Sequence, residues 1–351
     1  MAIRLPADKL NGLRPFYSGR DVCVTGGAGF IGGHLVDALF WLGANVRVID
    51  DLSNSTLEHL SDLIESDGDR VRFVHGSILD DEALSDVTEG CKTVFHLAAM
   101  GSVPRSIEQP QRYWSVNTTG TLRVLEAARA NGVERVVFAS SSSVYGDQVE
   151  LPKVESQPLK PMSPYAASKA ACEHLLGSWA ACYGLSAVAL RYFNVFGPRQ
   201  SADSGYAAVV PSFARAILTG GRPLIYGDGM QTRDFTYVGN AVFATLLAGA
   251  STTALNGQVM NIGTGKRVSI LDLASSIARL CSQPGVQPIL KPSRAGDVLH
   301  SVADITRAKA LIGYEPITRF EDGLAEAVAA YRETFSGSST DSSDGNAPGT
   351  R

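Results

Sequence analysis

Tyr165 and Lys169 form the pair of side chains in this sequence best suited to acid–base chemistry. Two helical side chains at this spacing lie on the same face, one turn apart. Lowering the pKa of a tyrosine from about 10 to neutrality requires about 4 kcal/mol. A lysine about 5 Å away supplies on the order of 3 kcal/mol of this at an effective dielectric of about 20, and a cationic nicotinamide ring nearby could supply the rest. We therefore predict that Tyr165 is a general base toward a sugar or alcohol hydroxyl.

The helix that must carry this pair has signals at both of its ends. Ser163 is a good N-cap residue, and Pro164 suits the first helical position. Gly184 can end the same helix. We therefore expect a helix over Pro164–Tyr183, with the pair in its first two turns. A tyrosine–lysine pair at this spacing often occurs by chance, so the other motifs in the sequence must decide whether this pair is catalytic.

A glycine-rich turn near the start of the chain points to a dinucleotide. It follows an expected strand and opens a helix, and it reads Thr25-Gly26-Gly27-Ala28-Gly29-Phe30-Ile31-Gly32. Its glycines let the chain turn tightly, let backbone amides approach a pyrophosphate, and let the helix pack close to a sheet. The N-terminus of that helix then faces the phosphates. Between a strand and a helix, this pattern is strong evidence for a dinucleotide site.

An acidic residue, Asp50, ends the next expected strand. Its carboxylate can accept hydrogen bonds from the ribose hydroxyls of the adenosine and would repel a 2′-phosphate. No arginine occurs in the next four residues, Asp51-Leu52-Ser53-Asn54. The sequence therefore favours NAD over NADP.

Short β-rich runs alternate with longer helical patterns in the first half of the chain. This alternation is typical of βαβ units and of a parallel sheet covered on both faces. The expected strands are Val22–Thr25, Val46–Asp50, Val71–His75, Thr93–Leu97, Val136–Ser140 and Ala187–Tyr192. The expected helices include Ile31–Leu42, Gln111–Asn131 and Pro164–Tyr183. We predict an α/β fold, a Rossmann-type doubly wound parallel sheet with a smaller, discontinuous substrate-binding lobe.

The alternation becomes irregular after Asn194, where glycine-rich turns occur more often. We expect residues 1–193 to form the NAD-binding domain, which also receives about 234–263. The smaller lobe is expected over 194–335, mainly 194–233 and 264–335. Residues 336–351 are Ser, Thr, Asp and Gly with almost no apolar side chain, so we expect a disordered tail.

Composition argues for a soluble globular protein. Of the 351 residues, 44% are apolar and 19% are charged, and the net charge is −4, which argues against nucleic acid or a membrane as a partner. The cysteines lack the spacing of a metal site or a disulfide framework, so we expect small buried side chains in a reducing compartment; they are Cys23, Cys91, Cys172, Cys182 and Cys281. With no signal peptide and no apolar run of membrane-spanning length, we expect a cytoplasmic protein without a metal.

Several further motifs succeed one another along the chain. They are His96-Leu97-Ala98-Ala99, Asn117, Ser140-Ser141-Ser142-Ser143-Val144-Tyr145-Gly146, Arg191-Tyr192-Phe193-Asn194-Val195-Phe196-Gly197, Thr232-Arg233-Asp234-Phe235 and Arg294-Ala295-Gly296-Asp297. Together with the glycine-rich turn and the tyrosine–lysine pair, these motifs resemble the extended short-chain dehydrogenase/reductase family over about 21–332. Within that family the chain is most similar to the UDP-hexose 4-epimerases, in the branch that acts on UDP-N-acetylglucosamine and related N-acetylhexosamines or their uronic acids.

The resemblance implies a role for individual residues. Tyr165 would be the base, Lys169 would also bond the nicotinamide ribose, and Ser141 would bridge Tyr165 and the 4-hydroxyl of the sugar. Asn194 and two arginines would contact the UDP diphosphate, and Asp297 would lie near the uridine ribose. The implied cofactor site comprises Gly26, Gly29, Phe30, Ile31, Gly32, Asp50, Leu97, Ala98, Ala99, Asn117, Tyr165 and Lys169. The implied substrate site comprises Ser102, Ser141, Ser142, Ser143, Asn194, Arg233, Arg294, Asp297 and Ser301.

The chain departs from the family pattern at Ser77. The family often has an aspartate there that contacts the adenine amino group, and Asp80 or a backbone carbonyl could replace it. His96, at a strand end, is interpreted as structural because Tyr165 already fills the role of the base.

The residues after Ser141 select among the reactions of the family. Related 4,6-dehydratases carry an Asp-Glu pair just before the Val-Tyr-Gly sequence, and related UDP-glucuronate decarboxylases carry a glutamate two residues before that tyrosine. Here these positions are Ser142 and Ser143. Without a carboxylate for elimination, a 4-keto sugar can only take its hydride back, on the opposite face if it turns over first. We predict an epimerase; the alternatives are a dehydratase or decarboxylase, and a non-enzymatic NAD sensor of the same fold.

Ser301 bears on the size of the sugar. At this position, epimerases restricted to non-acetylated sugars usually carry a tyrosine that narrows the pocket beside C2. The smaller Ser301 leaves room for an N-acetyl group, and its hydroxyl can bond the acetyl carbonyl. We therefore expect UDP-N-acetylhexosamines or their uronic acids as substrates, with UDP-glucose and UDP-galactose as the alternative. Members of the family dimerise through two long helices per subunit, here Gln111–Asn131 and Pro164–Tyr183, so the resemblance also implies a homodimer.

Overall fold

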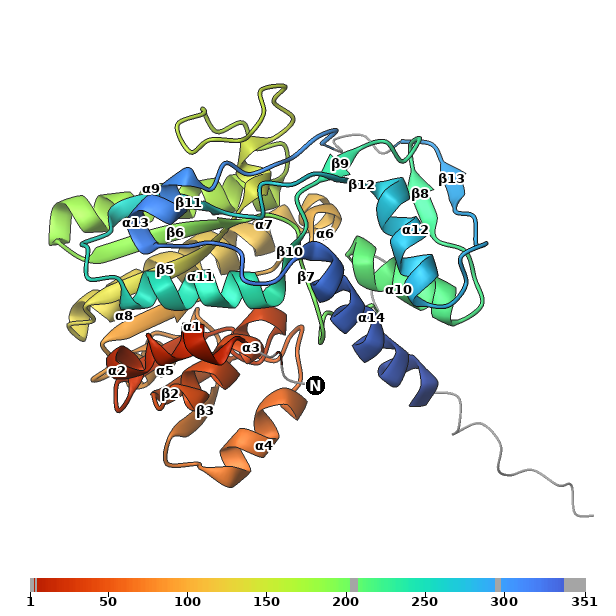
Figure 1. The fold of residues 1–351 in the computed structure, drawn as a ribbon. Coiled ribbons are helices and arrows are strands. Elements are labelled where there is room, and N and C mark those ends of the chain that lie inside the picture. Colours follow the sequence, from red (N-terminus) through yellow and green to blue (C-terminus); the bar gives the residue numbers. More distant parts are fainter. Residues whose placement is uncertain (1–2, 4, 203–207, 294–297, 338–351) are drawn as a thin grey trace, which may run out of the picture.

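A seven-stranded sheet forms the centre of the structure (Figure 1), a computed structural model that describes residues 3, 5–202, 208–293 and 298–337. The strand order is β11-β6-β5-β4-β1-β2-β3, and all neighbours are parallel. The order reverses between β1 and β4, so a dinucleotide is expected at the carboxyl ends of these strands. The strands are β1 Asp21–Thr25, β2 Asn45–Asp50, β3 Val71–His75, β4 Thr93–His96, β5 Arg135–Ser141, β6 Ser186–Tyr192 and β11 Asn256–Ile262.

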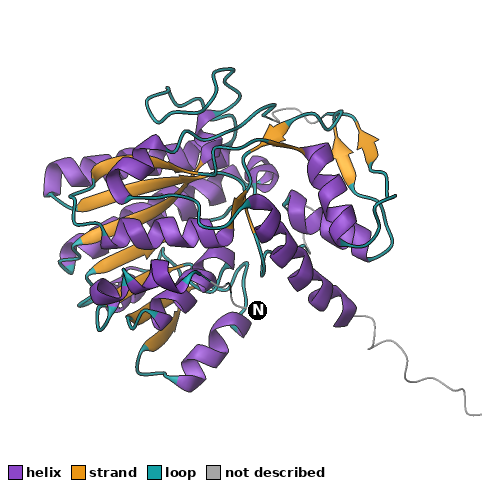
Figure 2. Cartoon of the chain, viewed as in Figure 1, coloured by secondary structure: helices purple, strands orange, loops and turns teal. Residues whose placement is uncertain are grey.

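Helices cover both faces of this sheet (Figure 2). Along β1, Val22 and Val24 contribute to one hydrophobic cluster and Cys23 to another, as expected when successive side chains point to opposite faces. The first cluster includes side chains of α2 Arg14–Tyr17, α3 Phe30–Trp41, α4 Glu58–Ser66 and α11 Val238–Ala250. The second cluster includes side chains of α5 Asp81–Thr88, α8 Gly120–Ala130 and α9 Pro164–Tyr183. The predicted doubly wound parallel sheet is confirmed.

Local signals located the main elements well. Each of the predicted strands agrees with an observed strand to within one residue at either end. Helix α9 spans the predicted Pro164–Tyr183, and the Ser163 hydroxyl accepts a hydrogen bond from the Ala166 amide at 3.1 Å. Gly184 ends α9 with a left-handed φ of 72°, which glycine adopts without a steric penalty.

The predicted helix Gln111–Asn131 is correct in extent but not in regularity. It comprises α7 Pro110–Tyr113, a π-helical segment Trp114–Thr119, and α8. The wider π-helical segment carries the buried Asn117. Such turns often occur at functional sites, and helix propensity alone does not reveal them.

The second half of the chain builds a smaller group of elements beside the main sheet (Figure 1). Strand β11 nevertheless returns to pair with β6, and α13 packs on β11. The proposed division of the chain into an NAD-binding domain and a smaller lobe stays a prediction. The remaining elements are α1 Ala7–Asn11, α6 Val103–Glu108, β7 Val195–Phe196, α10 Val209–Leu218, β8 Leu224–Tyr226, β9 Thr232–Arg233, β10 Thr236–Tyr237, β12 Val268–Ser269, α12 Ile270–Leu280, β13 Ile289–Lys291, α13 Thr306–Ile312 and α14 Phe320–Gly337.

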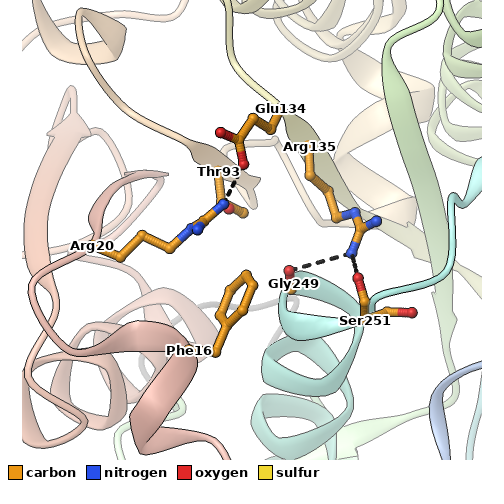
Figure 3. Close-up of a pocket in the computed structure, with 7 residues that line it drawn as sticks. All are labelled: Phe16, Arg20, Thr93, Glu134, Arg135, Gly249 and Ser251. Atoms are coloured by element: carbon orange, nitrogen blue, oxygen red, sulfur yellow. Dashed lines mark hydrogen bonds and ion pairs between the residues drawn. The ribbon is translucent and has the colours of Figure 1, made fainter.

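A pocket of about 100 Å³ lies at the amino-terminal edge of the sheet, where β4 and β5 begin (Figure 3). Arg135 donates hydrogen bonds to the Ala248 and Ser251 carbonyls and so caps the C-terminus of α11. Arg20 pairs with Glu134 across the same pocket. These contacts hold the N-terminal segment and α11 against the sheet, at the edge opposite the carboxyl ends of the strands.

All five cysteines are free. Four of them are buried, but Cys182 is exposed, contrary to the expectation for it. It lies near the end of α9, where the helix turns part of its surface away from the sheet. Within the described ranges, no helix is long and apolar enough to cross a membrane. The same described residues contain no group of three metal-binding side chains.

Candidate active site

The glycine-rich turn joins β1 to α3 at the edge of the sheet expected to bind a dinucleotide. Gly26 has a φ of 71°, and a Cβ atom there would lie 2.6 Å from the Ala98 amide nitrogen. A Cβ atom on Gly32 would lie 2.0 Å from the Gly26 carbonyl oxygen. Leu97 and Ala98 are held beside the turn because their amides bond the backbone and hydroxyl oxygens of Thr25. Only glycine fits at 26 and 32, and Phe30 and Ile31 begin α3 directly after Gly29. This backbone fits the dinucleotide site that the sequence predicts.

Asp50 lies at the carboxyl end of β2, against the same turn. One carboxylate oxygen accepts a hydrogen bond from the Ala28 amide at 3.0 Å. The other accepts from the Leu52 amide and the Ser55 hydroxyl, each at 3.0 Å. The carboxylate is therefore fixed in orientation beside the glycine-rich turn. A dinucleotide site of this kind has an acid there that accepts hydrogen bonds from the adenosine ribose.

Replacing Asp50 with alanine is expected to weaken NAD retention and to narrow the preference for NAD over NADP. The physical reason is that the substitution removes both an acceptor for the ribose hydroxyls and the charge that repels a 2′-phosphate. Equilibrium binding of both cofactors to wild type and Asp50→Ala measures the effect. Asp51→Ala, which removes the exposed neighbouring acid, is the matched control. Equal affinity of the wild-type protein for NAD and NADP would contradict the role given to Asp50.

Ser141, Tyr165 and Lys169 come together where β5 ends beside the first turns of α9. The Tyr165 hydroxyl lies close enough to the Ser141 hydroxyl for Ser141 to oppose the rise in its pKa. The ammonium group of Lys169 donates to the Ala139 carbonyl at 2.8 Å and lies 4.6 Å from the centre of the Phe138 ring. The predicted catalytic residues are therefore neighbours in space, although they come from two different elements.

The pKa of one residue in this group, Tyr165, differs from the expectation. Burial lowers the pKa of Lys169 to about 8. Burial also raises the pKa of Tyr165, and Ser141 opposes this rise only in part. The expected depression of the tyrosine pKa is wrong for the protein alone, because desolvation outweighs the opposing effect of Ser141. Positive charge brought close to the phenol would favour the tyrosinate.

His96 is a buried structural residue, as interpreted from the sequence. Its Nδ1 is 2.7 Å from the Thr25 hydroxyl and its Nε2 is 2.9 Å from the Thr121 hydroxyl. Burial lowers the pKa of His96 to about 3, with a smaller contribution from the charge of Lys169. Burial likewise lowers the pKa of His34, in α3, to about 3.

Acid is therefore expected to destabilise the protein through these two histidines. Their pKa values are lower in the folded protein than in the unfolded chain, so the stability they contribute is complete above about pH 6.5. It is lost as the pH falls toward 3, by up to about 1.4 kcal/mol per histidine for each pH unit. Urea unfolding between pH 7 and pH 4 should show a smaller pH slope for His96→Asn than for wild type. The exposed His300→Asn is the control, and equal slopes in all three proteins would argue against this assignment.

Asn117 contacts protein groups on two sides. Its side-chain oxygen accepts from the Met100 amide at 2.8 Å, and its amide group donates to the Met100 carbonyl and to the Ser168 hydroxyl. It therefore ties the loop after β4, which includes Ala99, to the catalytic helix α9. A direct contact of Asn117 with the cofactor stays a prediction.

The serines expected to contact the sugar occupy two turns near the catalytic group. Ser142 and Ser143 lie in a 3₁₀-helix, Ser142–Tyr145, which Ser141 caps by accepting from the Ser143 amide. Among the described residues, the buried Ser143 hydroxyl has no hydrogen-bond partner. Ser102 caps α6 by accepting from the Arg105 amide at 3.3 Å. A buried hydroxyl without a partner is costly, which favours a ligand at Ser143.

The residues expected to contact the diphosphate and the acetyl group lie on the smaller group of elements. Asn194 has a left-handed φ of 32°, a strained conformation that often marks a functional position. Arg233 donates to the Leu299 carbonyl at 3.1 Å, and the Ser301 amide donates to the Thr232 carbonyl at 3.1 Å. Arg233 and Ser301 therefore lie on neighbouring segments. The other two predicted substrate residues, Arg294 and Asp297, lie outside the described residues.

The position expected to contact the adenine has a local role in the structure. The Ser77 hydroxyl accepts a hydrogen bond from the Leu79 amide. Asp80, suggested as its replacement, caps α5 by accepting from the Glu82 and Ala83 amides. Its carboxylate is therefore already engaged, and an adenine contact from Asp80 stays a prediction.

A buried ion pair beside the catalytic group was missed from the sequence. Arg191 on β6 donates twice to the carboxylate of Glu173 on α9, at 2.9 and 2.7 Å. The Ser140 hydroxyl donates to the same carboxylate at 2.5 Å. The available signal was the spacing, since Glu173 lies one helical turn after Lys169 on the face that Tyr165 and Lys169 share.

Known proteins resemble the chain along most of its length. The profile described as NAD dependent epimerase/dehydratase family matches residues 22–263. A UDP-glucose 4-epimerase of Mycolicibacterium smegmatis is 40% identical over 311 residues, which cover 88% of this chain and 97% of that protein. The UDP-N-acetylglucosamine 4-epimerase from Methanobrevibacter ruminantium M1, solved in complex with UDP-N-acetylmuramic acid, is 40% identical with a TM-score of 0.85 and covers 90% of this chain and 99% of its own.

A third similar protein was solved with NAD bound. The UDP-glucose 4-epimerase of Thermus thermophilus, solved in complex with NAD, is 36% identical with a TM-score of 0.79 and covers 89% of this chain and 99% of its own. The family profile, which matches residues 22–263, spans the glycine-rich turn, Asp50 and helix α9. The chain therefore belongs to the NAD dependent epimerase/dehydratase family and takes NAD as its cofactor.

Proposed function

We propose that this protein inverts C4 of a UDP-sugar, with UDP-N-acetylglucosamine and UDP-N-acetylgalactosamine, or their uronic acids, as substrates. The observation that carries the proposal is the catalytic group itself: Ser141, Tyr165 and Lys169 lie together, and serines rather than carboxylates occupy positions 142 and 143. Several relatives of similar length are named as 4-epimerases of a UDP-sugar, whereas others are named as a decarboxylase or a 4,6-dehydratase.

The chain's own residues divide the reaction between them. Tyr165 takes the proton from the 4-hydroxyl, and Ser141, which lies next to Tyr165, bridges the two oxygens. The glycine-rich turn and Asp50 would hold NAD, which would supply the acceptor and donor for the C4 hydride. Lys169, whose pKa burial lowers to about 8, stays largely protonated at neutral pH and favours the tyrosinate.

Serines at 142 and 143 restrict the fate of the 4-keto sugar. Dehydration and decarboxylation require a carboxylate close to the sugar, and the 3₁₀-helix presents two hydroxyls instead. The 4-keto sugar can therefore only be reduced again. Return of the hydride to the opposite face after the sugar has turned inverts C4, and the proton returns from Tyr165.

Two features support an acetylated sugar. Ser301 is small and buried, with 8% of its surface exposed, so it occupies less volume beside the proposed sugar site than a tyrosine would. The Ser143 hydroxyl has no partner among the described residues and is available to a polar substituent of the sugar. A UDP-N-acetylglucosamine 4-epimerase is also among the structural relatives. UDP-glucose and UDP-galactose form the second candidate pair, because other relatives carry that name.

Turnover of a panel of UDP-sugars tests the proposal. Purified protein is incubated with UDP-GlcNAc, UDP-GalNAc, their uronic acids, UDP-Glc and UDP-Gal, and kcat/KM is measured for each. We expect the acetylated sugars to be interconverted faster than the others. A strong preference for UDP-Glc would overturn the substrate assignment, and absence of turnover on every member would overturn the epimerase assignment.

We also propose a homodimer formed through α9 and the segment from α7 to α8. Tyr183 and Trp114 on these elements expose 55% and 50% of their surfaces, and Ile107 in the neighbouring α6 exposes 65%. Exposed aromatic and aliphatic side chains on these elements suit a protein interface. Sedimentation equilibrium would reveal the dimer, and a monomer at micromolar concentration would contradict it.

A further inference from the structure

Three side chains on one face of α9 contact three successive residues of β5. Tyr165 lies next to Ser141, Lys169 donates to the Ala139 carbonyl, and Glu173 accepts from the Ser140 hydroxyl. Tyr165, Lys169 and Glu173 are one helical turn apart, so they form a single row. The first two positions of the row are the predicted base and its lysine. The third position has no assigned role.

Glu173 accepts hydrogen bonds from both other members of a buried polar group, Ser140 and Arg191. Its carboxylate accepts from Ser140 at 2.5 Å and from Arg191 at 2.9 and 2.7 Å. Ser140 and Arg191 are register partners on the neighbouring strands β5 and β6. Exposed fractions of 3% for Ser140, 6% for Glu173 and 3% for Arg191 place the whole group in the interior. The hydrogen-bonded carboxylate therefore joins α9, β5 and β6 at one point.

Further buried contacts lead from Arg191 toward the segment that carries Ser301. The Arg191 guanidinium lies 4.6 Å from the centre of the Tyr145 ring. The Tyr145 hydroxyl donates to the Asn261 side-chain oxygen at 2.7 Å, and the Asn261 side chain donates to the Lys153 carbonyl at 2.8 Å. Lys153 in turn pairs with Val302 and Ala303, the two residues after Ser301. A chain of buried contacts thus connects the catalytic helix with the segment that carries Ser301.

Stability alone does not explain this arrangement. Burying two charges is costly, and a well-packed apolar pair can be as stable as a buried ion pair or more so. The hydrogen bonds that Glu173 accepts from Ser140 and Arg191 do, however, hold these residues in one arrangement, although the buried Nη1 of Arg191 has no partner among the described residues. Here the members are the residue before Ser141 and the residue one turn after Lys169. The network is therefore in a position to set the separation between Ser141 and Tyr165.

We propose that Glu173 is a positioning residue for the epimerase reaction: with Ser140 and Arg191 it holds the end of β5 against α9 so that Ser141 stays next to Tyr165. The proposal rests on the function proposed above, because that function makes Tyr165 the base and Ser141 its bridge to the sugar. Glu173 does not touch the reacting atoms. It acts through the placement of Ser141 and through the charge it presents to Lys169.

Ser140→Ala is the most specific variant, because it removes one hydroxyl and leaves the Arg191–Glu173 pair intact. In the NAD-loaded protein with its best UDP-sugar, we expect kcat to fall roughly 10-fold to 100-fold, as displacements of the order of 1 Å commonly cause. KM for the UDP-sugar and retention of NAD should be unchanged. Thr88→Val, which removes a buried hydroxyl on α5, is the matched control and should leave kcat unchanged.

The double variant Glu173→Leu with Arg191→Met separates positioning from stability. It removes both charges together, so it should fold even where either single variant does not. We expect its thermal midpoint to be close to that of wild type while kcat stays low. Recovery of wild-type kcat in this double variant would show that the pair is only structural and would overturn the proposal.

The pH profile gives an independent readout. The charge of Glu173 partly opposes the lowering of the Lys169 pKa by burial. Glu173→Gln should therefore move the basic limb of the kcat profile to lower pH, whereas Ser140→Ala should leave that limb in place. An unchanged limb in folded Glu173→Gln would contradict the electrostatic part of the proposal.

Spectroscopy keeps the proposal separate from the function on which it rests. In carbon-13 tyrosine-labelled, NAD-loaded protein, the Tyr165 signal is assigned by its loss in Tyr165→Phe. Ser140→Ala should shift that signal, because the Ser141–Tyr165 contact changes, even if no tested UDP-sugar is turned over. A Tyr165 signal and a kcat both equal to those of wild type would overturn the proposal. Absence of wild-type turnover with a shifted signal would instead count against the proposed function alone.

Discussion

Tyr165→Phe is expected to lower kcat for UDP-sugar epimerisation by roughly 10²–10⁴ while NAD remains bound. The substitution removes only the phenolic hydroxyl, so the packing of α9 is kept and the sole candidate base is lost. His96 cannot replace it, because both of its ring nitrogens are engaged with the Thr25 and Thr121 hydroxyls. The measurement is kcat on the best UDP-sugar, together with the NAD content of the purified variant.

Tyr17→Phe is a suitable control for this substitution. It removes another buried phenolic hydroxyl, one that donates to the Leu246 carbonyl on the far side of the sheet. Its effect should fall on stability and not on kcat. Near-normal turnover by purified Tyr165→Phe would exclude Tyr165 as the base, whatever the behaviour of the control.

Ser301→Tyr is expected to abolish preference for acetylated sugars. The segment around Ser301 is held on both sides, because the Ser301 amide bonds Thr232 and the Lys153 amide bonds Val302 at 2.8 Å. Such a backbone cannot retreat from a larger side chain, so the phenol ring must occupy the space proposed for the N-acetyl group. A misfit of even one methylene group in a substrate pocket costs about 1–3 kcal/mol of discrimination. Turnover of UDP-GlcNAc should therefore fall roughly 10-fold to 100-fold in kcat/KM, while UDP-Glc and UDP-Gal are spared.

The comparison requires both sugar pairs in both proteins. Ser301→Ala keeps the space but removes the hydroxyl, so it measures separately how much a hydrogen bond from Ser301 contributes. If Ser301→Tyr still handles UDP-GlcNAc as wild type does, Ser301 does not line the sugar pocket. The argument from its small size would then fail, although the assignment of Tyr165 would be unaffected.

Local chemistry in the sequence determined the elements that carry the site. Ser163, Pro164 and Gly184 set the bounds of α9 through backbone capping and dihedral preference, which act over a few residues. The same holds for the glycine-rich turn, where a Cβ atom on Gly26 or Gly32 would overlap nearby backbone. Strand ends could be located from apolar runs and their flanking turns for the same reason. The family resemblance then assigned roles to residues that these elements bring together.

Only the tertiary structure decided how burial changes the chemistry of those residues. The pKa of Tyr165 is raised, not lowered, because desolvation sums over everything packed around the phenol and not over its helical neighbours alone. The π-helical segment around Asn117 likewise depends on contacts with Met100 and Ser168, which lie far from it in the sequence.

The partnership of Glu173 with Arg191 was hidden for a related reason. In the sequence, a glutamate on a helix and an arginine on a strand are ordinary surface charges. They become a buried pair only because β5 and β6 lie in register and α9 packs across both. Spacing along one helix could be read from the sequence, but the distance between two elements is set by the packing of the whole sheet.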